Sequence, residues 1–249
     1  MSPIQCCEFQ TTKLLIDDSQ EFQFALSFCL PPEKGPYQFM TNPLESLKCL
    51  QKQTPLLDVR QPEANLKKLR SYADNPNEID KIGVVFIDYS MPSLTGLEVF
   101  EQVQPSCSER ILLTAMTDEK IAAQAFNRGL INQYISKQDP NLTKTILEAI
   151  KTGQKKYFQC STQDFFTDII QNEPDTALRD PAFIQFFSAL KEKLGIVAYF
   201  LLDFIGSFLM LDSNKTRYKL TLLKTPLSKE QGAYPIHESG FYYLLDSII

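Results

Sequence analysis

The sequence has few of the histidine and cysteine residues that form metal sites and nucleophilic active sites. It has one histidine, His237, and no tryptophan among 249 residues. Six cysteines are present, but none stand in Cys-x-x-Cys pairs. A zinc site and a Ser-His-Asp or Cys-His nucleophile are therefore not expected. The adjacent Cys6 and Cys7 are predicted to be free thiols.

Long apolar segments and basic tails are also missing. The most apolar stretch, residues 196–211, is interrupted by Asp203 and Gly206, whereas a membrane-spanning helix needs about 20 apolar residues. The N-terminus has neither the basic start nor the apolar centre of a signal peptide. A net charge of -5 at pH 7 argues against general affinity for nucleic acid. We expect a cytoplasmic protein that does not bind membranes and for which nucleic acid is not the favoured partner.

The most informative stretch that is present runs from Val84 to Gly96 and reads VVFIDYSMPSLTG. Its first four residues are apolar and lead directly into a carboxylate, Asp88. A short apolar run without alternation is typical of a parallel strand that is buried on both faces. Asp88 is therefore predicted at the carboxyl end of a strand, which is the edge where open α/β sheets bind ligands.

The same pattern of a short strand followed by a helix repeats over residues 1–158. Strands are predicted at 13–16, 37–41, 84–88, 110–115 and 130–136, and helices at 20–30, 42–50, 96–104, 118–128 and 139–158, with Thr117 as the N-cap of the fourth helix. Five such units predict a doubly wound parallel sheet. Loops longer than about 15 residues are uncommon in compact domains, so residues 51–82 are predicted to be an insertion with a helix at 62–73.

Polar side chains follow the predicted strands at the points where they end. Asp17 and Asp18 follow the first strand, Asp88 and Thr114 end two others, and Lys137 follows the fifth. The carboxyl ends of parallel strands share one edge, so these side chains should meet there. Three crowded carboxylates repel one another unless a cation is shared, and Mg²⁺ suits such an oxygen-only site. An ammonium and a hydroxyl nearby would suit an incoming phosphoryl group.

Four motifs occur in order: Asp17-Asp18-Ser19, residues 86–96, Leu113-Thr114-Ala115 and residues 134–137. Together they resemble the receiver domain of bacterial two-component response regulators, a CheY-like domain with a flavodoxin-like five-stranded sheet. The resemblance covers roughly residues 13–158. It implies that Asp88 is the phosphoacceptor, which attacks a phosphohistidine of a sensor histidine kinase or phosphotransfer protein. Self-phosphorylation and dephosphorylation would be the only enzymatic activity of this domain.

The resemblance also implies how Mg²⁺ is held. Asp18, Asp88 and the backbone carbonyl of Ser90 would be its ligands, and Asp17 would act largely through metal-bound water.

Further roles in phosphoryl binding and signalling follow from the same resemblance. Lys137 would pair with the acyl phosphate, Thr114 would bond to a phosphoryl oxygen, and Tyr134 would follow Thr114 as the aromatic switch. Met116, two residues beyond Thr114, is expected to slow hydrolysis of the phosphoryl group. The sequence departs from the family after Lys137, because no proline follows directly and the loop must take another geometry.

Residues 159–249 predict a second, smaller α+β domain. Helices are expected at 164–171 and 181–194, and strands at 196–202, 207–211 and 217–223, with a hairpin turn at 213–215. Residues 199–212 faintly resemble a PAS-like sensory module. No helix-turn-helix or basic face is evident. Three outputs stay open: interaction with an unidentified downstream protein or homodimerisation, a signalling enzyme, or a DNA-binding regulator.

Overall fold

The structure is a computed structural model, and it describes residues 4–76, 79–114, 119–224, 233–237 and 239–248. It divides into two units. Gln10–Leu56 and Asp80–Cys160 form the parallel-sheet unit, and Met1–Phe9, Leu57–Ile79 and Ser161–Ile249 form the antiparallel-sheet unit. The sequence predicted a different division, in which the first nine residues and the insertion belonged with the parallel sheet. Thr117 and Met116 lie outside the described residues.

The parallel-sheet unit contains five strands in the order β3-β2-β4-β5-β6, and all neighbours run parallel. Its strands are β2 (Thr12–Ile16), β3 (Tyr37–Met40), β4 (Ile82–Asp88), β5 (Glu109–Thr114) and β6 (Gln133–Ser136). Its helices are α1 (Gln20–Cys29), α2 (Pro43–Gln51), α4 (Gly96–Glu101), α5 (Glu119–Asn127) and the first part of α6 (Leu142–Asn172), with a 3₁₀ turn η1 (Pro32–Lys34). The predicted doubly wound, flavodoxin-like sheet is confirmed.

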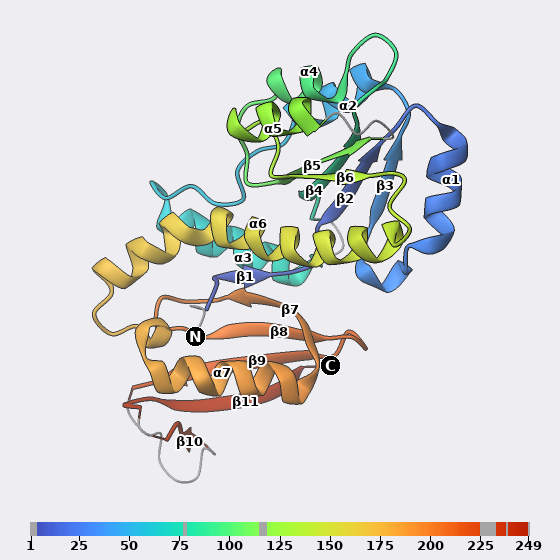
Figure 1. The fold of residues 1–249 in the computed structure, drawn as a ribbon. Coiled ribbons are helices and arrows are strands. Elements are labelled where there is room, and N and C mark those ends of the chain that lie inside the picture. Colours follow the sequence, from blue (N-terminus) through green and yellow to red (C-terminus); the bar gives the residue numbers. More distant parts are fainter. Residues whose placement is uncertain (1–3, 77–78, 115–118, 225–232, 238, 249) are drawn as a thin grey trace. The chain divides into compact units, whose positions relative to one another are not determined.

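Helices cover both faces of this sheet (Figure 1). Alternate residues of β4 point to opposite faces, and all seven are buried because helices cover both faces. Val85 and Ile87 pack with apolar side chains of α2, α4 and α5. Val84 and Phe86 pack with those of α1 and α6. Burial on both faces explains why this strand is a continuous apolar run.

Helix α6 differs most from its predicted form. It runs without a break for 31 residues, where two helices at 139–158 and 164–171 were predicted. No glycine or proline stands between residues 159 and 163 to end it. The predicted boundary at 158/159 therefore falls inside a helix that continues from the parallel-sheet unit into the antiparallel-sheet unit.

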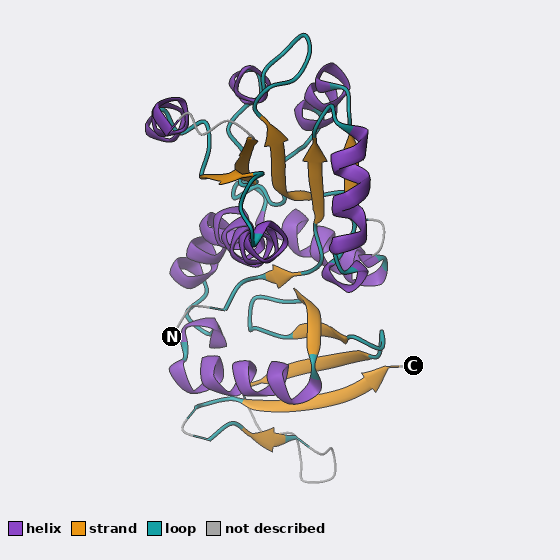
Figure 2. Ribbon diagram, turned by 45° about the vertical axis from the view of Figure 1, so that its right-hand side comes forward, coloured by secondary structure: helices purple, strands orange, loops and turns teal. Residues whose placement is uncertain are grey.

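Among its described residues, the antiparallel-sheet unit contains six strands in the order β1-β7-β8-β9-β11-β10. Its elements are β1 (Cys7–Glu8), α3 (Pro62–Asp74), η3 (Ala177–Arg179), α7 (Pro181–Leu194), β7 (Ile196–Leu201), β8 (Phe208–Asp212), β9 (Arg217–Leu223), β10 (Tyr234–Pro235) and β11 (Tyr242–Ile248). Helix α7 lies along the sheet (Figure 2), and its Phe187 packs on Tyr199 and Phe208. The predicted smaller α+β domain is confirmed. Its resemblance to a PAS-like module stays a prediction.

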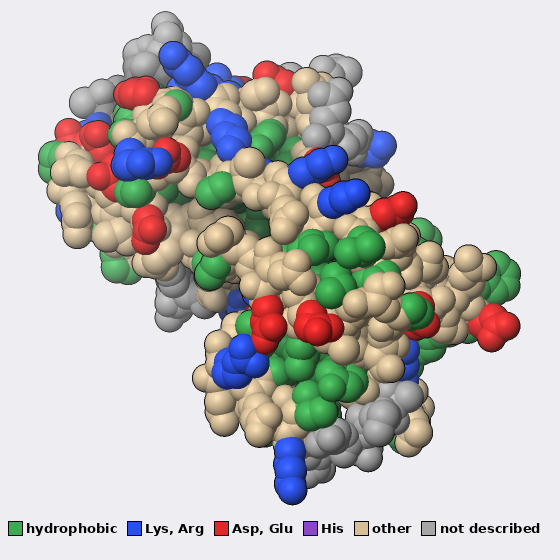
Figure 3. Space-filling model, turned by 90° about the horizontal axis from the view of Figure 1, so that it is seen from above, with side chains coloured by type: hydrophobic (Ala, Val, Ile, Leu, Met, Phe, Trp, Pro, Cys, Tyr) green, Lys and Arg blue, Asp and Glu red, His purple; other side chains and the backbone are tan. Residues whose placement is uncertain are grey.

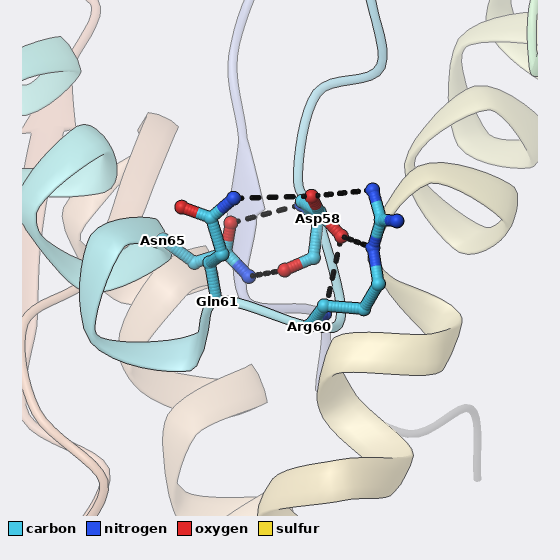
Figure 4. Close-up of polar contacts among 4 residues, drawn as sticks. All are labelled: Asp58, Arg60, Gln61 and Asn65. Atoms are coloured by element: carbon cyan, nitrogen blue, oxygen red, sulfur yellow. Dashed lines mark hydrogen bonds and ion pairs between the residues drawn. The ribbon is translucent and has the colours of Figure 1, made fainter.

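The insertion contributes α3, whose first turn is shaped by a side-chain network (Figure 4). The buried Asn65 amide donates to the backbone carbonyl of Asp58 at 2.7 Å and accepts from the Asp58 backbone N–H at 2.9 Å. Arg60 makes two hydrogen bonds of 3.0 Å to the Asp58 carboxylate. Later in α3, Tyr72 packs edge-on to Phe9, which stacks on Phe200 of β7. These contacts agree with the assignment of Leu57–Ile79, the central part of the insertion, to the antiparallel-sheet unit.

The cysteines are only partly as predicted. Cys6 and Cys7 are free, as expected, and both are buried, while Cys29 and Cys49 are also free. Cys107 and Cys160, however, form a disulfide between positions 53 residues apart. No helix in the described part of the chain is both long and apolar enough to cross a membrane.

Lys13 is an unexpected buried charge in β2. Its side chain is 0% exposed, and its ammonium donates to the Lys34 carbonyl at 2.7 Å. A side chain on Gly35, which has φ of 111°, would strike this ammonium. Burial lowers the pKa of Lys13 from 10.5 to about 8. The folded protein therefore loses this proton at a lower pH than the unfolded chain does.

The lowered pKa of Lys13 predicts that this residue makes stability rise with pH. Between about pH 8 and 10.5 the unfolded chain binds the Lys13 proton and the folded protein does not, so Lys13 should add about 3 kcal/mol in total to the free energy of unfolding. The buried Cys6 and Cys7 thiols, whose pKa values are raised, act in the opposite direction above about pH 9, so the increment is measured against Lys13→Met, which keeps both thiols. In urea unfolding at several pH values, the free-energy difference from Lys13→Met should grow by this amount in the wild type and in Lys34→Met, which keeps the carbonyl acceptor. Equal pH dependence in all three proteins would contradict the assignment to Lys13.

Candidate functional site

The carboxyl ends of β2 and β4 bring three acidic side chains together. These strands are paired in parallel, with Ile16 opposite Ile87, so Asp17 and Asp88 follow at the same level of the sheet. Asp18 comes next along the chain. One carboxylate oxygen from each of Asp17, Asp18 and Asp88 lies within 4.8 Å of the others. Strand register alone thus explains why residues 70 positions apart form one cluster.

Two of these carboxylates are buried and one is exposed. Asp17 is 1% exposed and Asp88 is 5% exposed, while Asp18 faces solvent. One oxygen of Asp17 accepts the Ser19 backbone N–H at 3.0 Å. One oxygen of Asp88 accepts the Ser90 backbone N–H at 2.9 Å. These bonds fix the orientation of both carboxylates.

The remaining oxygens of the buried pair face Lys137. Its ammonium lies 2.6 Å from Asp17 Oδ2 and 2.7 Å from Asp88 Oδ1, and 4.7 Å from the centre of the Phe22 ring. The chain reaches this position because the Lys137 backbone N–H donates to the Thr114 carbonyl at 2.9 Å. One ammonium therefore bridges two buried carboxylates.

Burial and charge pairing oppose each other at this cluster. Burial raises the pKa of Asp88 above its usual value, and the bonds from Lys137 and Ser90 only partly offset this. Burial alone would lower the pKa of Lys137, but its bonds to Asp17 and Asp88 outweigh that effect and raise it. Lys137 thus keeps its proton at neutral pH, and its charge favours the ionised form of Asp88.

The loop after Asp88 is folded back tightly, which explains two residues of the opening motif. Met91 is buried in the core under α2 and α4. The Gly96 N–H donates to the Tyr89 carbonyl at 3.1 Å, and a Cβ on Gly96 would strike the Asp88 carbonyl. A glycine is therefore required here to let α4 begin directly beside the Asp88 backbone.

The other residues singled out from the sequence lie near the cluster to different degrees. Thr114 is buried at the end of β5, next to Ser136 of β6 in the ladder. Ser90 is exposed beside Asp88. Tyr134 lies on β6, two residues before Ser136, and its side chain is 44% exposed. The structure thus brings together Asp17, Asp18, Asp88 and Lys137 and leaves Tyr134 at the surface.

The donor set fits a hard divalent cation. All three acidic groups offer oxygen, and no sulfur or imidazole lies among them. The exposed Asp18 leaves one side of the cluster open to water, which suits an ion that keeps part of its hydration shell.

No family model and no curated protein matches the chain. Among solved structures, the response regulator LqsR of Legionella pneumophila is similar at 25% identity and a TM-score of 0.75, covering 99% of this chain and 90% of that one. A CheY-like receiver domain protein of Methanospirillum hungatei shares 17% identity at a TM-score of 0.43, covering 59% and 95%. The response regulator domain of Thermotoga maritima CheB shares 18% identity at a TM-score of 0.40, covering 58% and 96%.

The whole-length similarity to LqsR agrees with the order of the motifs and with the sheet topology. Over nearly all of its length the chain thus resembles a response regulator, and its parallel-sheet unit has the five-stranded, doubly wound flavodoxin-like fold.

Proposed function

We propose that this protein is a two-component response regulator that receives a phosphoryl group on Asp88. The observation that carries the proposal is the Lys137 ammonium bound to both Asp17 and Asp88 at the carboxyl edge of the parallel sheet. An Asp88 oxygen attacks the phosphorus of a phosphohistidine on a sensor histidine kinase or phosphotransfer protein. The P–N bond breaks, and its electron pair stays with the imidazole. An acyl phosphate forms on Asp88.

The residues around Asp88 serve this transfer by holding charge in place. Lys137 favours the ionised carboxylate before the transfer and pairs with the phosphoryl group afterwards. Thr114, buried at the end of the neighbouring strand, donates its hydroxyl to a phosphoryl oxygen. Tyr134 then changes its exposure as Thr114 moves. Phosphoryl transfer depends mainly on such positioning and charge stabilisation.

Mg²⁺ belongs to the same proposal. Asp18, Asp88 and the Ser90 carbonyl would hold it, with Asp17 acting through bound water, and the ion would neutralise the negative charge of the incoming phosphoryl group.

The output of the protein is proposed to be protein interaction or dimerisation through the antiparallel-sheet unit. Helix α6 supports this because it begins just beyond Lys137 and continues into that unit. DNA binding is less favoured, since acidic and basic side chains lie among one another on the face shown in Figure 3 and neither sign forms a continuous patch there.

Phosphorylation can be tested with Mg²⁺ and acetyl phosphate as a small phosphodonor. Intact-mass spectrometry should show one added phosphoryl group on the wild type and none on Asp88→Asn. Asp80→Asn, an exposed carboxylate just before β4, is the matched control and should be labelled like the wild type. An unlabelled wild type, or label on Asp88→Asn, would show that Asp88 is not the acceptor.

Removing the Asp18 carboxylate should lower the affinity for Mg²⁺, and removing the Lys137 ammonium should raise it. Losing one liganding carboxylate weakens the attraction for the ion by on the order of 1–3 kcal/mol, so Asp18→Asn should bind Mg²⁺ about tenfold or more weakly. Lys137→Met should bind it more tightly, because no ammonium competes for Asp17 and Asp88. Isothermal titration calorimetry measures both, with Asp80→Asn unchanged. A Lys137→Met protein with weaker binding would refute this electrostatic account.

Signal output can be followed by hydrogen exchange of the full chain. Phosphorylation should alter amide exchange in residues 161–224 of the wild type, and the phosphodonor should have no such effect on Asp88→Asn. Changes confined to the parallel-sheet unit would argue against an output through the antiparallel-sheet unit.

A further inference from the structure

Helix α6 is fastened to the parallel sheet by a disulfide far from the carboxylate cluster. Cys107 lies in the loop that precedes β5, and Cys160 lies on α6, with 5.5 Å between their Cα atoms. Cys160 is also the last residue of α6 that belongs to the parallel-sheet unit, because the unit boundary falls between residues 160 and 161. The disulfide thus marks the point where α6 passes from one unit to the other.

Two further contacts hold the same face of α6. Lys156 Nζ lies 2.6 Å from Oε1 of the buried Glu109, the first residue of β5. Gly153 packs so closely that an added Cβ would come within 2.9 Å of Val84 and 3.0 Å of Glu109. Positions 153, 156 and 160 follow the i, i+3, i+7 spacing of one helix face. Of these three attachments of α6, the disulfide at Cys160 is the last along the helix, and in the described residues it is the only covalent one.

Cys107 and Cys160 are more exposed to solvent than the buried cysteines Cys6 and Cys7. Cys160 is exposed and Cys107 is half-buried, so a thiol in solution can reach the bond. Cys6 and Cys7 are buried, and burial raises the pKa of both thiols. With four of six cysteines free, the chain does not use disulfides as its general means of stabilisation. Accessible disulfides of this kind are the ones that exchange readily.

We propose that the Cys107–Cys160 bond is a redox-sensitive clamp on α6. A thiolate of the glutathione class attacks one sulfur, the S–S bond breaks, and a mixed disulfide forms with the other cysteine released as a thiolate that takes up a proton. A second glutathione then attacks the mixed disulfide. Glutathione leaves as its own disulfide, and Cys107 and Cys160 end as two thiols, having gained two electrons and two protons.

Reduction leaves α6 held at this face by the Lys156–Glu109 ion pair and the packing of Gly153, and beside it by the buried side chains of Tyr157 and Phe158. The helix beyond residue 156 then opens more often, because its covalent attachment to the loop before β5 is gone. The same strand ends at Thr114, and the same helix begins just after Lys137. The clamp therefore adjusts how firmly the helix that follows Lys137 is joined to the strand that carries Thr114. This inference does not depend on phosphorylation of Asp88.

The test uses the full chain equilibrated in buffers of reduced and oxidised glutathione. After acid quenching and alkylation, peptide mass spectrometry should show the Cys107–Cys160 bond in oxidised buffer, its loss in reduced buffer, and its return on reoxidation. A bond that never forms, or one that reduced glutathione leaves intact in the native protein, would overturn the proposal.

Hydrogen exchange on the same samples tests whether reduction lets α6 open more often beyond residue 156. Amides of residues 157–172 should exchange at least about tenfold faster in the reduced protein. Cys160→Ser should show the fast rate in both buffers, and Cys29→Ser, which alters an exposed free cysteine, should behave as the wild type. Asp88→Asn should keep the full redox difference, which separates this result from the phosphorylation tests. Equal exchange in reduced and oxidised wild type would refute the clamp.

Discussion

The ion pair of one ammonium with two buried carboxylates is the constraint on which the parallel-sheet unit depends. Asp17 and Asp88 each lose most of their hydration, and without a cation they would repel each other at short range. Lys137 offsets both effects with contacts of 2.6 and 2.7 Å. A buried ion pair is weak evidence of stability, because hydrophobic residues in its place often serve as well. Its place at a ligand-binding sheet edge indicates function instead.

Several local features of the fold hold Asp17, Asp88 and Lys137 in their relative positions. The parallel pairing of β2 with β4 sets Asp17 beside Asp88, and the pairing of β5 with β6 sets the start of the Lys137 loop beside Thr114. Gly96 lets the chain after Asp88 return without disturbing its backbone. The capping box of Thr95 and Glu98 then starts α4 at once. The turn after Asp88 and the register of the parallel strands therefore both determine where the carboxylates and Lys137 lie.

The sequence was sufficient to predict the sheet and the cluster because both follow from local patterns. A continuous apolar run predicts a buried parallel strand, and the polar residue that ends it must lie at the common edge. Lys13 could not be predicted in this way, since its burial depends on a carbonyl 21 residues away and on the space left by Gly35. The pairing of Cys107 with Cys160 was equally hidden, because six cysteines allow many pairings. The place of β1 depends on pairing with β7, about 190 residues further along the chain.

The turn after Lys137, where the sequence lacks the proline of the receiver motif, is held by hydrogen bonds instead. Where the receiver motif that the sequence resembles has a proline, the Ser136 hydroxyl accepts the Gln138 N–H at 3.2 Å and the Asp139 N–H donates to the Ser136 carbonyl at 3.1 Å. The Asp139 carboxylate then accepts from the Asn141 N–H at 2.8 Å and from the Thr145 hydroxyl at 2.7 Å. These bonds lower the pKa of Asp139, with Thr145 as the largest cause, and its negative charge suits a helix N-terminus. A hydrogen-bonded turn thus connects Lys137 to the first turn of α6, so any displacement of Lys137 would also shift the residues where that helix begins.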